Sequence, residues 1–217
     1  MIEVLTENFG DFASGLWVTV RLVLASLAVA LVLGTLVAAL RISPSGVLRR
    51  LATVYTEVFR GLPLLVIIFI AYAGVRRGGV PIGAWTAGII SLGIYTSAYV
   101  AEALRSGVSA VAPGQREAAL SLGFSEREVL RRIVLPQAFR TVIPPLGSIT
   151  IAMIKNSAIL GASLLALPDL LKAARVVNSN TFQTDEAFFW GAVGYLLLTV
   201  SATIAFRRLE TRYAVRR

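Results

Sequence analysis

Long apolar blocks separated by short polar stretches dominate the chain, and five of them have the length of a membrane-spanning helix. A helix needs about 20 mostly apolar residues to cross a hydrocarbon core of about 30 Å. The five blocks run from Leu22 to Leu40, Leu51 to Gly74, Ile82 to Leu104, Val142 to Leu167 and Ala187 to Phe206. The pattern therefore predicts an all-α, polytopic membrane protein with five transmembrane helices and one domain spanning residues 1–217.

Glycine, proline and polar residues predict where these helices begin, bend or break. We expect the first helix to begin near Leu16, and the Gly61-Leu62-Pro63 sequence to interrupt the second. The polar Lys155-Asn156-Ser157 sequence predicts a locally unwound stretch near the middle of the fourth helix. Pro63 and Pro144-Pro145 are predicted to supply positions where bending is easy.

Composition supports a membrane protein and indicates its orientation. The chain is 56% hydrophobic and only 15% charged, whereas soluble domains carry about 25% charged residues. The net charge is +9, but the arginines flank the apolar blocks without interleaved aromatic residues, which argues against nucleic-acid binding. Arginine-rich loops stay in the cytoplasm, so we expect the N-terminus outside and the C-terminus inside. The arginines on the expected cytoplasmic side are Arg41, Arg49, Arg50, Arg105, Arg116, Arg127, Arg131, Arg132, Arg140, Arg207, Arg208, Arg212, Arg216 and Arg217.

Cysteine and histidine are both missing from the sequence. Thiol nucleophiles, imidazole bases and the usual zinc sites are therefore excluded. The enzyme class that remains is an intramembrane Ser–Lys hydrolase, in which Lys155 would activate Ser148 or Ser157. We expect no metal, no cofactor on this chain and no cleaved signal peptide, because the first residues lack the basic start and short apolar core of one.

The polar stretch from about residue 105 to 140 is long for a connection between helices. Pro113-Gly114 predicts the start of a short helix, Gly123 its end, and Ser125 with Glu128 a capping box that opens a second helix. The apolar residues of this loop are predicted to form a face that packs against another surface; they are Leu120, Phe124, Val129, Ile133 and Leu135.

This loop carries a specific resemblance. Glu117-Ala118-Ala119, Gly123, Ile133 and Leu135-Pro136 reproduce the EAA signature of bacterial ABC importer permeases, with nine residues between the glycine and the isoleucine. The flanking blocks resemble the polar amino-acid permeases of that group, and the likeness covers about Gly15 to Arg212. The blocks are Tyr55 to Leu64, Ala98 to Gly107, Leu135 to Arg140 and Pro144 to Gly147.

The resemblance implies a permease half in the bacterial plasma membrane. Such a subunit pairs with a second permease (a copy or a paralogue), binds two cytoplasmic ATPase subunits and receives an amino acid from an extracytoplasmic binding protein. The sequence contains no glycine-rich phosphate loop, so ATP and Mg²⁺ are expected on the partner ATPase. The residues expected to couple to that ATPase are Glu117, Ala118, Ala119, Gly123, Leu135 and Pro136.

Charged residues inside the apolar blocks are the candidate substrate ligands. An ionised lysine at membrane depth needs a partner or water, so Lys155 can bind a substrate carboxylate while Glu57 binds its ammonium group. Lys155 can instead form a structural ion pair with Glu57, and Glu57 can pair with Arg60 three residues later. The resemblance implies that positions matching Glu57 and Lys155-Asn156 bind substrate. Asn156 replaces the Asp of many relatives, which disfavours a cationic substrate.

Hydroxyl groups on the third apolar block complete the predicted site. Tyr95, Thr96 and Tyr99 share one helix face, although hydroxyls at such positions also bridge helices. The sequence around them resembles actinobacterial glutamate-uptake permeases, so we expect glutamate import, with glutamine, cystine or a basic amino acid as alternatives. A gradient-driven carrier is a more distant alternative. The predicted substrate ligands are Glu57, Thr96, Tyr99, Lys155, Asn156 and Ser157.

Overall fold

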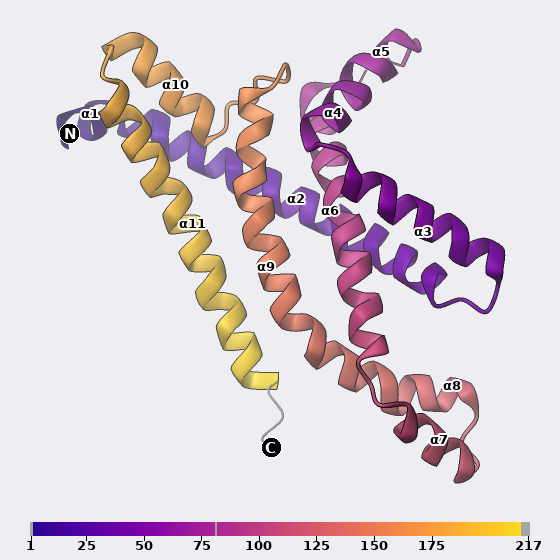
Figure 1. Cartoon of the computed structure of the whole chain (residues 1–217). Coiled ribbons are helices and arrows are strands. Elements are labelled where there is room, and N and C mark those ends of the chain that lie inside the picture. Colours follow the sequence, from indigo (N-terminus) through magenta and orange to yellow (C-terminus); the bar gives the residue numbers. More distant parts are fainter. Residues whose placement is uncertain (1, 81, 214–217) are drawn as a thin grey trace.

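The computed structural model describes residues 2–80 and 82–213, and of Arg76 the backbone alone. Every element of regular structure in these ranges is a helix (Figure 1). In chain order, with η marking a π-helix, they are α1 (Ile2–Glu7), α2 (Phe9–Arg41), α3 (Gly46–Gly61), α4 (Leu64–Phe69), η1 (Ile70–Gly74), α5 (Val75–Arg77), α6 (Ala84–Ser109), α7 (Pro113–Ser121), α8 (Glu126–Val129), η2 (Leu130–Val134), α9 (Leu135–Ala162), α10 (Leu170–Thr181) and α11 (Thr184–Tyr213).

The prediction of an all-α polytopic membrane protein is confirmed. Among the described residues, four helical runs are long and apolar enough to cross a bilayer: Phe9–Arg41, Ala84–Ser109, Glu126–Ala162 and Thr184–Tyr213. The number rises to five when α3 and the segment that follows it are counted together as one broken span.

The second predicted helix is sharply bent rather than merely interrupted. Its two halves, Gly46–Gly61 and Leu64–Gly74, meet at 106°. Pro63 has no N–H group to donate, and the residue before a proline is forced out of the helical region. Leu62 accordingly takes extended backbone angles of φ −90° and ψ 139°. The helix axis therefore turns between Gly61 and Leu64, and α3 leaves the direction of α4 (Figure 1).

The fourth predicted helix differs from its expectation in two ways. It begins earlier, at Leu135, and runs without interruption to Ala162, so the predicted unwinding at residues 155–157 is wrong. Pro144 and Pro145 lie inside the helix and do not interrupt it, and the ease of bending at these two positions stays a prediction. Neighbouring helices and side chains can satisfy the carbonyl groups that prolines leave without a donor.

The most extensive packing between two helices joins α2 to α6, and α6 in turn packs against α9. Glycines permit the close approach of the first pair. Gly34 of α2 lies against Val100 of α6, and Gly93 of α6 lies against Val29 of α2. With no side chain at these two positions, the helix backbones come close enough for extensive van der Waals contact.

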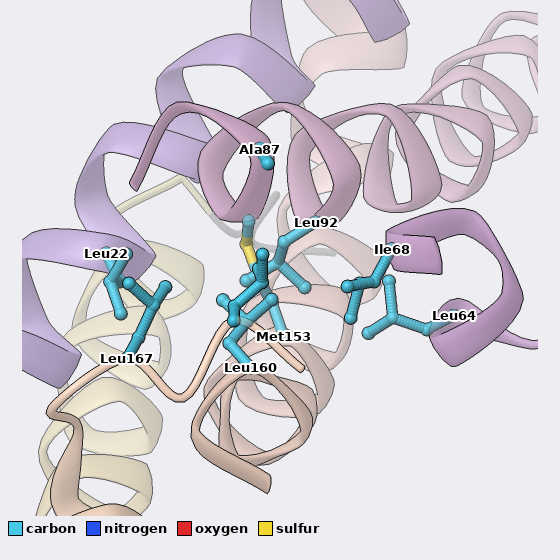
Figure 2. Packing of buried hydrophobic residues seen from close by; sticks show 9 residues of the cluster. Leu22, Leu64, Ile68, Ala87, Leu92, Met153, Leu160 and Leu167 are labelled. Atoms are coloured by element: carbon cyan, nitrogen blue, oxygen red, sulfur yellow. The ribbon is translucent and has the colours of Figure 1, made fainter. Parts of the chain in front are cut away.

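The largest buried apolar cluster fills the space between α2, α4, α6 and α9 (Figure 2). Leu22 and Leu92 are fully buried there, and Met153 is 1% exposed. The cluster locks α6 and α9 together beside the polar residues described below. Its buried members are Leu22, Leu64, Ile68, Ala87, Leu92, Met153, Leu160, Leu165 and Leu167.

The two ends of the helix bundle differ. The N-terminus, α1 and α10 lie at one end, whereas α7, α8 and the end of α11 lie at the other (Figure 1). The residues that the sequence places in a cytoplasmic loop are thus separated from α10 by the length of the long helices.

Candidate functional site

Three of the six predicted substrate ligands line one cavity between α6 and α9. Thr96 and Tyr99 of α6 face Asn156 of α9 across a space of about 130 Å³. The apolar cluster of Figure 2 adjoins this space, because Met153 belongs to the cluster and Tyr95 packs against it. We call this space the amide compartment, after Asn156. Its lining consists of Tyr95, Thr96, Tyr99, Ile149, Ala152, Met153 and Asn156.

Some hydroxyl groups of α6 face the amide compartment and one faces α3. The hydroxyls of Tyr95 and Tyr99 lie 3.1 Å apart, and their rings are 5.1 Å apart. Thr96 is only 3% exposed. Ser97 faces away from the compartment, because its hydroxyl lies 2.7 Å from that of Tyr55 on α3. The predicted band of Tyr95, Thr96 and Tyr99 is therefore present, and one neighbouring hydroxyl bridges helices instead.

The remaining predicted ligands lie elsewhere. Lys155 precedes Asn156 by one residue, which rotates it by about 100° around α9, and its side chain is exposed outside the compartment. It lies about two turns before the end of α9 at Ala162, so it is not near the middle of that helix. Ser157 is buried and donates to the carbonyl oxygen of Ile154 at 2.7 Å.

Glu57 is exposed on α3, one turn before the bend. Among the described residues, no ion pair joins Glu57 to Lys155 or to Arg60. Both predicted pairings are therefore wrong for this chain. Glu57 does not line the compartment that holds Asn156, and its role in binding substrate stays a prediction.

A charged cluster missed by sequence reasoning lies next to the compartment. Glu102 forms an ion pair with Arg105, three residues later on α6, and it also binds Arg41 from the end of α2. Arg60 of α3 approaches the same carboxylate at 3.9 Å. Local i, i+3 spacing is a signal for the first pair alone, because the other two arginines come from distant parts of the chain.

A second missed group is a buried carboxylate in the connection between α9 and α10. Asp169 is fully buried and accepts a hydrogen bond from the backbone N–H of Lys172 at 2.8 Å, which caps α10. Burial raises the pKa of Asp169 to about 6, while hydrogen bonds from neighbouring groups partly oppose that shift. The Pro168-Asp169 sequence before a helix was the available signal for this cap.

The predicted coupling loop has its own small core. The capping box of Ser125 and Glu128 is present, and Gly123 turns the chain with a φ of +86°, which a glycine adopts without strain. Glu117 is the fifth residue of α7, beyond its first turn. Hydrogen bonds from Ser125 to the carboxylate of Glu128 lower the pKa of that exposed group.

The apolar face predicted for this loop packs mostly within the loop itself. Val129 is 1% exposed, and Leu120, Phe124 and Ile133 pack around it. Leu135, the fifth residue of the predicted face, is exposed. The exposed apolar side chain at the tip is Leu122, between α7 and α8, beside exposed Glu117 and Ala118.

The bundle of apolar helices, the polar compartment between α6 and α9 and the loop that resembles the EAA signature are typical of a membrane transport subunit. The chain belongs to the family of binding-protein-dependent transport system inner membrane components, which it matches over residues 30–215. It is thus a multi-pass inner-membrane transport component and not an enzyme.

Named relatives and a solved structure extend over nearly the whole chain. A probable glutamine ABC transporter permease of Bacillus subtilis, GlnM, is 39% identical over 97% of both chains. The glutamate transport system permease GluC of Corynebacterium efficiens is 34% identical over 93% of both chains. A crystal structure of an amino acid ABC transporter with histidines has a TM-score of 0.90 at 35% identity and covers 96% of both chains.

Proposed function

We propose that this chain is the permease half of an ATP-driven importer. The polar amino acid moves along the contact between α6 and α9, which we call the α6–α9 seam. The observation that carries the proposal is the amide compartment, in which hydroxyl and amide groups meet inside an otherwise apolar bundle. Polar groups at membrane depth mark substrate pathways. The glutamine and glutamate permeases among its relatives support an amino-acid substrate.

The lining favours glutamine over glutamate. No charged side chain lines the compartment among the described residues, so an entering carboxylate side chain would lose water without gaining a counter-charge. An amide side chain can instead exchange hydrogen bonds with Asn156 and the hydroxyl of Thr96. Glutamate is the second candidate, because Lys155 adjoins Asn156 and can supply the missing charge if the assembled transporter turns it toward the substrate.

The α7–α8 loop is the proposed contact with the ATPase. Its exposed residues Glu117, Ala118, Leu122 and Gly123 form the end of the molecule from which α6 and α9 run directly to the compartment (Figure 1). Movement of the loop on ATP binding is thereby transmitted to both walls of the compartment. This assignment places the C-terminus in the cytoplasm and the N-terminus outside, in agreement with the arginine distribution.

A second permease subunit, either a copy or a paralogue, is proposed to cover the exposed side chain of Lys155. An ionised lysine within a spanning helix is costly against lipid. In a subunit interface it faces protein or water instead. ATP and Mg²⁺ bind the partner ATPases, and an extracytoplasmic binding protein delivers the amino acid.

Uptake by the reconstituted complex tests the proposal. Proteoliposomes containing this chain, its ATPase and its binding protein are supplied with labelled glutamine and ATP, and unlabelled glutamine, glutamate, cystine and arginine compete in separate runs. We expect saturable, ATP-dependent uptake that glutamine inhibits most strongly and arginine least. Uptake driven by a proton or sodium gradient without ATP would contradict the importer class, and preference for glutamate would contradict only the choice of substrate.

A further inference from the structure

A second cavity, more polar than the first, continues the α6–α9 seam toward the coupling loop. It has a volume of about 280 Å³. Tyr99 and Ile149 line both cavities, so the two spaces adjoin. On α6 the lining passes from Tyr95 to Ser106, and on α9 from Asn156 back to Thr141, which in both helices is the direction of the loop. An amino acid leaving the amide compartment inward therefore meets this second space next.

The second cavity borders an excess of positive charge. Glu102 is the carboxylate of a cluster that holds three guanidinium groups, those of Arg41, Arg60 and Arg105. Arg41 and Arg105 both hydrogen-bond Glu102 directly. These two arginines bind the two carboxylate oxygens of Glu102, one each. The third arginine of the cluster therefore has no direct hydrogen bond to the carboxylate.

Arg60 is that third arginine, and it faces the cavity. Its side chain is 44% exposed and stands 3.9 Å from Glu102, beyond hydrogen-bond distance. Among the described residues it alone of the three arginines lines this space. Its guanidinium lies 5.5 Å from the ring centre of Tyr99, and such stacking holds a planar guanidinium in a defined orientation.

We propose that Arg60 binds the α-carboxylate of the amino acid in this second cavity, which makes the cavity a second binding site on the inward path. A guanidinium binds a carboxylate through two parallel hydrogen bonds, and Glu102, which also lines the cavity, already accepts hydrogen bonds from the other two arginines. The inference rests on the proposed function, since it requires an amino acid to enter from the amide compartment. Because every amino acid carries the α-carboxylate, this second binding site does not distinguish amino acids by their side chains. Selection among side chains takes place in the amide compartment.

Single cysteines can report on the cavity, because the native chain contains none. Ser106→Cys places a thiol on the cavity wall, and Thr141→Cys on the facing helix is the alternative if the first variant does not transport. The purified complex in nanodiscs is treated with an anionic or a cationic methanethiosulfonate reagent. We expect Arg60→Met to lower the ratio of anionic to cationic labelling rates by about tenfold or more, because a nearby unit charge acts on the two reagents in opposite directions.

Protection by substrate tests the carboxylate contact itself. Glutamine should slow labelling of Ser106→Cys, whereas glutamine α-amide, which lacks the carboxylate, should not at the same concentration. Arg60→Lys should keep the charge preference of labelling but weaken protection, because an ammonium cannot form the paired hydrogen bonds. Arg50→Met is the matched control, since it removes one arginine from an exposed position of the same helix, outside the cavity lining.

Two outcomes would overturn the inference while leaving the proposed function intact. The first is ATP-dependent uptake by the parent complex together with equal protection by glutamine and its α-amide. The second is a labelling ratio that Arg60→Met changes no more than Arg50→Met does. Absence of amino-acid uptake by the parent complex would instead contradict the proposed function.

Discussion

Replacement of Gly34 by alanine tests whether the α2–α6 contact sets the geometry of the transport seam. A Cβ atom at Gly34 would lie 2.7 Å from both Cβ and Cγ1 of Val100 and 2.9 Å from the carbonyl oxygen of Ser97. Carbon atoms pack best at about 3.5–4.0 Å, so α2 and α6 must separate by about 1 Å. A backbone oxygen in the contact leaves no flexible side chain to absorb that shift.

The expected loss of stability follows from two opposing effects. Overpacking of a tight contact costs about 1–3 kcal/mol, and alanine in place of glycine within a helix recovers at most about 1 kcal/mol. Because the backbone is involved, we expect the upper part of that range and a net loss of about 1–2 kcal/mol. For a chain of this size, each kcal/mol corresponds to about 2–4 °C in Tm.

Gly10→Ala provides the matched control on the same helix. A Cβ at Gly10 meets no atom within 4 Å, so this variant should be neutral or slightly more stable than the parent. The assay is the temperature at which half of the purified complex loses its monodisperse peak on size-exclusion chromatography. A Gly34→Ala variant as heat-resistant as Gly10→Ala would refute the argument that backbone proximity at this contact is required.

Three further predictions concern the compartment, the loop and the buried carboxylate. Asn156→Asp places a negative charge in the amide compartment, so arginine should compete for uptake about tenfold more strongly, as expected for a new charged hydrogen bond. Gly123→Asp should abolish transport while the protein still inserts into the membrane, because a charge enters the exposed tip between α7 and α8; full uptake by this variant would disprove the coupling role. The pKa of Asp169 is raised from 3.8 to about 6 by burial, so the native state binds this proton more tightly than the unfolded state and the free energy of unfolding should fall as pH rises from about 4 to about 6. Asp169→Asn retains a capping oxygen and should lose that pH dependence, which thermal unfolding across this pH range would detect; an unchanged pH profile would contradict the assignment.

Local pattern was sufficient for much of this protein. The lengths of the apolar blocks predicted the spanning helices, and the Ser125–Glu128 spacing predicted a capping box that the structure contains. The break at Pro63 and the turn at Gly123 followed from the backbone restrictions of proline and glycine. Each of these features depends on residues that are close together in the chain, within one apolar block or one turn, so the sequence alone determined them.

Contacts between distant residues were decided by tertiary packing. Arg41 and Glu102 are 61 positions apart, and the backbone N–H of Leu170 binds Thr19, 151 positions away. Neither pairing has a local signal, because each depends on how tilted helices cross. The proline at position 63 predicted only that a break occurs, and not the angle of 106° between the two halves of the broken helix.

The division of roles between Lys155 and Asn156 shows the same limit. Both residues are polar and adjacent on one apolar helix, so hydropathy identified the pair and not the member that faces the cavity. Continuous hydrogen bonding through α9 sets the rotation between them, and the packing of α9 on α6 decides which one lines the compartment. The sequence by itself determined the class of protein and the segments that form it, whereas the choice of residues that meet in the seam was made by helix rotation and crossing, which no local pattern encodes.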